Sequence, residues 1–185
     1  MLSRYFRNAE TSDLEVTLLL AIAGSGLLIP YARLTESNHP SKDSSRFESA
    51  KDSINAVLQS KFVGSPLRPK SDPGSWKAGS LNDITDSPDS WDWSSIKPIS
   101  KDKTVSPLLK ILRNALAHEN IFTLGSTRIE SIVFVSMQVH NEPTAGYNCV
   151  SVSPDDFKEF ISLWLKLLAE AKIPGDVVSK ELILV

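Results

Sequence analysis

One short stretch of the sequence brings together side chains that could do chemistry. Arg113, Asn114 and His118 lie within six consecutive positions. On a helix, Asn114 and His118 are one turn apart, and the long side chain of Arg113 can reach the same patch. A guanidinium can hold a phosphate through paired hydrogen bonds, and an imidazole can give or take a proton near neutral pH. Residues of these types are compatible with a site that binds an anion and moves protons.

The same residues also have a purely structural explanation. An Arg and a His near a helix C-terminus interact favourably with the negative end of the helix dipole. Spacing alone favours this explanation. Residue 117, however, is alanine, which is small for a position that faces solvent. It leaves room for a second helix to approach, such as one from another subunit.

Other kinds of site are not indicated. His39, His118 and His140 are widely spaced and no Cys/His cluster exists, so we expect no metal and no cofactor. No nucleophile elbow accompanies the serines. The Gly-Ser-Gly at 24–26 follows no strand and lacks a Lys-Ser/Thr pair, so close helix packing explains it better than a phosphate loop.

The three candidate residues require a helix over about 102–117. Its apolar residues fall on one narrow face. That face comprises Val105, Leu108, Leu109, Leu112 and Leu116. Two β-rich stretches follow at 130–137 and 147–152, separated by a turn at 141–146, and they predict one hairpin. Ser153-Pro154 then marks the start of a last helix.

Two further helices are expected before this part. The stretch 16–29 is apolar on nearly all sides but too short to span a bilayer comfortably, and acidic Asp13 and Glu15 precede it. A secretory signal would have cations there. We therefore expect a buried helix and a cytoplasmic protein. A second helix is expected over about 44–62.

Between these helices and the motif lies an irregular insertion at 64–99, rich in Pro and Gly. It contains Trp76, Trp91 and Trp93. We expect these tryptophans to pin the insertion to the core; the alternative is a platform on which bases stack. The fold class predicted is mainly α, a helical bundle with one small β-hairpin between the motif helix and the last helix. A single domain is expected over 1–185.

Composition limits what the chain could bind. Its net charge is −2, so no broad positive field would attract nucleic acid, and contact with a polyanion requires a local cluster of cations. The single cysteine, Cys149, excludes an internal disulfide framework and is typical of a reducing compartment.

The motif and its flanks resemble a known family. The segment 112–121, Leu-Arg-Asn-Ala-Leu-Ala-His-Glu-Asn-Ile, is similar to the signature of HEPN domains (higher eukaryotes and prokaryotes nucleotide-binding), in which four residues separate Arg from His. The Ile-Val-Phe-Val strand and the Ser-Pro-Asp-Asp-Phe helix start are similar to bacterial members with a hairpin after the motif helix. The similarity covers about 108–168. One departure is Glu119, where related sequences often have glycine; it adds a negative charge beside the candidate site.

The resemblance implies a metal-independent endoribonuclease of the toxin or defence type. Arg113, Asn114 and His118 from two subunits would then form the site, with no cofactor. The expected partners are a second copy of the chain, RNA, and an antitoxin or a nucleotide ligand, with no membrane. Two alternatives remain open. One is a catalytically silent dimerisation or partner-binding module of the same fold, and the other is a nucleotide-binding domain in which Arg113 grips a phosphate without cleavage.

Overall fold

The computed structural model describes residues 15–31, 45–68, 75–85, 87–126, 128–138 and 146–171. His39 and His140 lie outside these residues. The chain divides into two compact units, one made of Met1–Val57 with Ile161–Val185 and the other of Leu58–Phe160. The expectation of a single domain stays a prediction.

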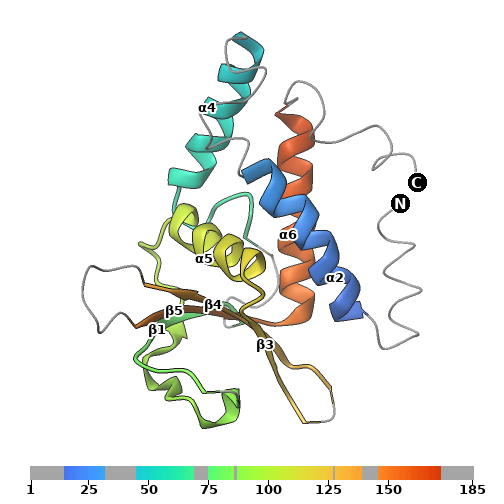
Figure 1. The fold of residues 1–185 in the computed structure, drawn as a ribbon. Helices are drawn as coiled ribbons and strands as arrows, with labels where there is room; N and C mark the ends of the chain where they lie inside the picture. Colours follow the sequence, from blue (N-terminus) through green and yellow to red (C-terminus); the bar gives the residue numbers. More distant parts are fainter. Residues whose placement is uncertain are drawn as a thin grey trace. The chain divides into compact units, whose positions relative to one another are not determined.

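The second unit is built on a five-stranded antiparallel sheet with the strand order β2-β1-β5-β4-β3 (Figure 1). The strands are β1 (Lys77–Leu81), β2 (Lys97–Pro98), β3 (Ile121–Leu124), β4 (Ser131–Met137) and β5 (Tyr147–Val152). β4 and β5 are the long central pair, with Phe134 opposite Val150. The two form the hairpin that the sequence predicted.

The prediction of a mainly α fold with one small hairpin is wrong. The insertion at 64–99 supplies β1 and β2, and β3 follows the motif helix directly. A physical reason is that both faces of β4 are buried, so the hairpin needs cover on two sides and partners at both edges. β1 pairs along β5, and β3 pairs along β4. The chain is therefore a mixed helix-and-sheet protein.

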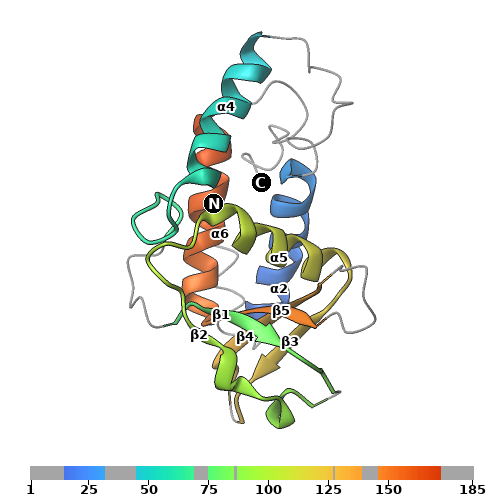
Figure 2. The same cartoon turned by 90° about the vertical axis from the view of Figure 1, so that its left-hand side faces the viewer.

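Helix α5 (Val105–Ala117) covers one face of this sheet, over β4 and β5 (Figures 1 and 2). Alternation along β4 turns Ile132 and Phe134 toward this face, where the first turn of α6 (Pro154–Glu170) adds Phe157. The rings of Phe134 and Phe157 lie 4.8 Å apart. Leu108, Leu109 and Leu112 of α5 are fully or almost fully buried. This apolar layer fixes the position of α5.

The middle of the insertion covers the opposite face of the sheet (Figure 1). Trp91 is 6 % exposed and packs edge-on against Phe122 of β3, with the ring centres 4.8 Å apart. Its indole N–H donates to the carbonyl of Thr85, and that of Trp93 donates to the carbonyl of Pro88. These contacts confirm that the tryptophans pin the insertion to the core. Stacking of bases on Trp91 is not compatible with its burial.

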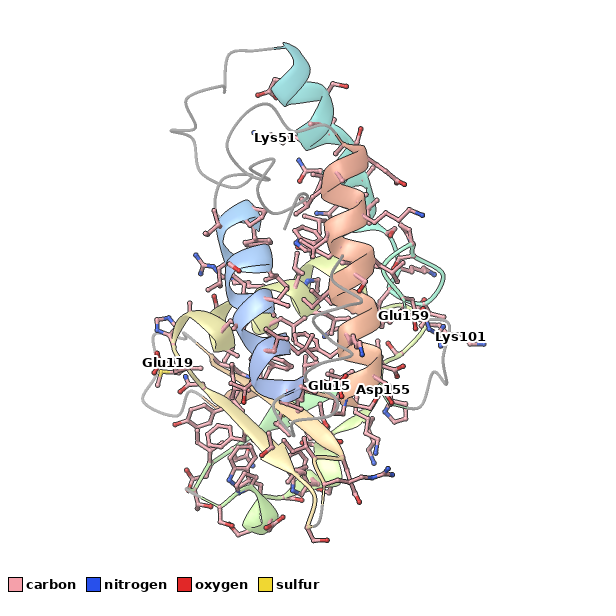
Figure 3. All side chains as sticks on the ribbon, turned by 90° about the vertical axis from the view of Figure 1, so that its right-hand side faces the viewer. Glu15, Lys51, Lys101, Glu119, Asp155 and Glu159 are labelled. Atoms are coloured by element: carbon pink, nitrogen blue, oxygen red, sulfur yellow. The ribbon has the colours of Figure 1, made fainter. Side chains whose placement is uncertain are left out.

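The first unit contains the predicted apolar helix. It comprises α2 (Glu15–Ala23) and a π-helical turn at Gly24–Leu28. The later turns of α6 lie beside it (Figures 1 and 3), and the indole N–H of Trp164 donates to the carbonyl of Gly26 at 2.9 Å. A Cβ at Gly26 would lie 3.1 Å from Cδ2 of Leu165. Close helix packing is thus confirmed as the role of this glycine.

The predicted second helix is α4, which runs from Ser45 to Gln59. Its apolar stripe is buried at Ala50 and Ile54, as its periodicity indicated. Within the part of the chain that the structure describes, every helix is too short or too polar to span a membrane.

Candidate functional site

Helix α5 carries all three candidate residues. Its buried side differs slightly from the predicted face, because Ile111 and Ala115 are buried while Leu116 is only half-buried. Arg113 and Asn114 are half-buried at the edge of this core, and Ala117 and His118 are exposed. The helix therefore presents the motif where its packed side meets solvent.

Asn114 is held between the helix and the sheet. Its side-chain Nδ2 donates to Oγ of Ser136 on β4, with 3.1 Å between the atoms. Its Oδ1 accepts a hydrogen bond from Nη1 of Arg113 at 2.8 Å. Ser136 is only 6 % exposed, so the anchor of this chain of bonds lies in the packed interior. The result is a guanidinium that is tied through an amide to β4.

The C-terminus of α5 places His118. His118 is the last residue before the chain leaves the helix, and its main-chain N–H still donates to the carbonyl of Asn114. Glu119 then adopts a left-handed conformation with φ of 58°. The N–H of Asn120 reaches back to the carbonyl of Ala115 at 2.9 Å, which is the bonding of a Schellman cap.

This cap explains why position 119 favours glycine. A left-handed conformation places the Cβ of an L-residue against its own carbonyl, and glycine has no Cβ. Glu119 lies at the end of α5 in Figure 3 and is exposed. The imidazole of His118 is also exposed and makes no hydrogen bond with another described residue. It is therefore free to meet a substrate or a second copy of the chain.

A groove of about 390 Å³ opens between α5 and the ends of β4 and β5. Asn114 and Ser136 lie in its wall. At its far side, Nε2 of Gln138 donates to Oγ of Ser80 on β1 and to Oδ1 of Asn148 on β5, each at 3.1 Å. The groove is lined by Lys103, Pro107, Lys110, Ile111, Asn114, Ser136, Met137, Gln138 and Asn148.

A second groove of about 240 Å³ adjoins the first, because Lys103, Ile111 and Asn148 line both. It extends over β1 and β2 and adds Lys97 to the wall. None of the described residues that line the two grooves is acidic. We call the two together the lysine groove. It gives a protein of net charge −2 a local concentration of positive charge.

Sequence reasoning found the motif but missed the lysine groove. Two of its residues could have been noticed in the sequence. Ser136 lies on the same face of β4 as Ile132 and Phe134, and Asn148 lies on the same face of β5 as Val150. A polar residue at a position that faces the core is unusual and needs a partner. Lys97 and Lys103 left no such signal.

Neither a metal cluster nor a cysteine nucleophile is indicated in the described part of the chain. No group of three or more His, Cys, Asp or Glu residues is placed there to hold a metal ion. Cys149 is buried, and desolvation raises the pKa of its thiol to about 12. Because the thiolate is the reactive form, this cysteine is unsuited to act as a nucleophile.

Comparison with known proteins identifies a family. A family model described as HEPN pEK499 p136 matches residues 1–174. No curated protein and no solved structure matches the chain.

Proposed function

We propose that this chain, which belongs to the HEPN pEK499 p136 family, is a metal-independent endoribonuclease that uses the 2′-OH of RNA as its nucleophile. The bond chain from Ser136 through Asn114 to Arg113 is the observation that carries this proposal. It holds a permanent cation in a set direction on the helix that also carries an exposed imidazole. RNA supplies the nucleophile itself, so a site need only move protons and stabilise charge.

Each motif residue then has one role. Arg113 binds the scissile phosphate and offsets the charge that develops on its oxygens. Asn114 keeps the guanidinium in place. His118 takes the proton from the 2′-OH or gives one to the leaving oxygen. The 2′-oxygen bonds to phosphorus while the bond from phosphorus to the 5′-oxygen breaks, which leaves a 2′,3′-cyclic phosphate and a 5′-OH.

Two copies of the chain complete the site in this proposal. One imidazole cannot easily remove a proton and donate another in the same step. A two-fold dimer brings a second Arg113 and His118, so one imidazole acts as base and the other as acid. Exposed Ala117 supports this arrangement, because its small side chain allows a close approach of two copies of α5.

The experiment is RNA cleavage by the purified protein in excess EDTA. The wild-type chain cuts single-stranded RNA, and His118→Ala and Arg113→Ala each remove cutting while circular dichroism shows an unchanged fold. His118 is exposed, so its replacement leaves the core intact. Cutting that survives His118→Ala would overturn the assignment of the site.

A second function is favoured by Glu119. Its exposed carboxylate follows His118 directly and opposes the approach of a phosphate. A catalytically silent module for dimerisation or partner binding would tolerate this charge. Expression in bacteria separates the two, because a ribonuclease toxin slows growth and Arg113→Ala relieves the effect, whereas a silent module does neither. Calorimetric titration with ATP and GTP tests nucleotide binding.

A further inference from the structure

The lysine groove has the charge of an anion-binding surface. Lys97, Lys103 and Lys110 line it, and none of the three forms an ion pair with another described residue. Lys97, Lys103 and Lys110 are also exposed. Three cations along one depression repel each other, and a bound chain of negative charges would remove that repulsion.

The floor of the lysine groove offers hydrogen bonds at fixed positions. Gln138 joins Ser80 and Asn148, and Asn114 joins Ser136, so the amides are oriented by their neighbours. Amide groups both donate and accept, and they can pair with the edges of nucleotide bases. These edges are free in a single strand, while A-form duplexes hide them in a deep, narrow groove. Met137, which is 59 % exposed, adds an apolar surface against which a base can lie.

The lysine groove also adjoins the motif. Asn114 lines it and at the same time bonds to Arg113. A strand whose scissile phosphate lies at Arg113 would therefore run past Asn114 into the groove without leaving the surface. Adjacent phosphates would then meet Lys110 and Lys103, and more distant ones would meet Lys97.

We propose that the lysine groove binds the backbone of single-stranded RNA on one side of the scissile phosphate. This inference rests on the proposed ribonuclease function, and it adds a binding track that belongs to one copy of the chain. The site of cleavage needs two copies, whereas the track lies within residues of a single sheet and helix. Binding and cutting can therefore be tested separately.

The test measures RNA binding without cutting. The full chain with His118→Ala binds a fluorescein-labelled single-stranded RNA, and its anisotropy gives the affinity at several salt concentrations. Addition of Lys103→Ala and Lys110→Ala weakens binding about 25-fold at 0.1 M salt, since each lost contact to a single strand contributes about 0.7 to the salt exponent. The slope of log affinity against log salt accordingly falls in magnitude by about 1.4.

The matched control removes the same charge elsewhere. Lys77 and Arg128 are exposed, line neither groove and form no ion pair with another described residue. Lys77→Ala with Arg128→Ala changes the net charge equally but leaves the slope unchanged. Gln138→Ala weakens binding without changing the slope, because it removes an amide and no cation.

Three results would overturn the inference. In the first, the groove variant and the control variant lose RNA affinity equally. In the second, the matching RNA duplex binds as tightly as the single strand. In the third, polyglutamate displaces the labelled RNA as effectively as unlabelled RNA does. The first would indicate a diffuse field, the second a site that reads duplex shape, and the third a site for acidic protein segments. Each leaves the ribonuclease proposal standing, because cleavage in EDTA is measured on the wild-type chain.

Discussion

Asn114 on α5 donates a hydrogen bond from Nδ2 to Oγ of Ser136 on β4, and 3.1 Å separates the two atoms. A guanidinium only donates, so the acceptor end of the amide, Oδ1, faces Arg113. The donor end, Nδ2, then bonds to the hydroxyl of Ser136, which ties the amide to the sheet. A hydroxyl in the strand is thus linked through one amide to a guanidinium that it does not touch.

Ser136→Ala tests whether this control matters for cleavage. The loss of one hydrogen bond lowers the free energy of unfolding by about 1 kcal/mol, while the freed guanidinium lowers kcat roughly tenfold to hundredfold. Ser136→Thr keeps a hydroxyl and restores most of kcat. A purely structural role for Ser136 would change stability with kcat unaltered, and steady-state kinetics on a fluorogenic RNA distinguishes the two.

Glu119→Gly should stabilise the protein. Release of the left-handed conformation at φ 58° increases the free energy of unfolding by about 1 kcal/mol. Glu119→Ala is the matched control, because it removes the same charge but keeps a Cβ and so gains nothing from the backbone. Urea denaturation measures both. RNA affinity, in contrast, rises to the same extent in the two variants if the carboxylate repels phosphate. Equal free energies of unfolding for the two variants would refute the explanation from the cap.

Gly79→Ala tests the close packing of β1 against the segment that precedes β2. A Cβ at this position would lie 2.9 Å from the carbonyl carbon of Ser95 and would collide with its oxygen. The backbone must move, which lowers the free energy of unfolding by about 1–3 kcal/mol. Gly24→Ala serves as the control, since a Cβ at Gly24 meets nothing within 4 Å. Equal thermal unfolding midpoints for the two variants would contradict this packing.

Cys149 should be unreactive in the folded protein because it is buried. Burial raises the pKa of its thiol from the ordinary value of 9.0 to about 12. Between these two pH values the thiol ionises in the unfolded chain but not in the native protein. The native thiol stays inert to iodoacetamide at pH 8, and the free energy of unfolding falls as pH rises above 9.0. Rapid alkylation of the folded wild-type protein would contradict its burial.

Ala117→Cys then reports whether two copies of α5 face each other. Because Cys149 is buried and does not react, mild oxidation of Ala117→Cys yields a covalent dimer through residue 117. Lys77→Cys, whose thiol is exposed on β1, yields none. Non-reducing electrophoresis gives the result. Equal cross-linking of both variants would indicate random collision and remove the support for a paired site.

The motif helix was predictable because its signals are local. Apolar residues recur every three to four positions along α5, and this helix and its C-cap carry the three candidate residues. The burial of Leu108, Leu109 and Leu112 agrees with this periodicity. Such patterns need no knowledge of distant parts of the chain.

The strands beside the central hairpin were not predictable for the opposite reason. β1 has the sequence Lys-Ala-Gly-Ser-Leu, which has no β-branched residue, and it is a strand because it pairs along β5 about seventy residues later. The lysine groove depends on the same pairing, since it brings Ser80 beside Asn148. Only the folded chain reveals that Lys103 shares a groove with Asn114 and that Lys97 lines the adjoining groove.

The most direct measurement is the chemical nature of the RNA ends produced in EDTA by the wild-type chain and by His118→Ala. Our account requires 2′,3′-cyclic phosphate and 5′-OH ends from the wild-type chain, none from the variant, and no cut at a position that carries a 2′-deoxy sugar. Identical ends from both proteins, or cutting of the 2′-deoxy substrate, would contradict it.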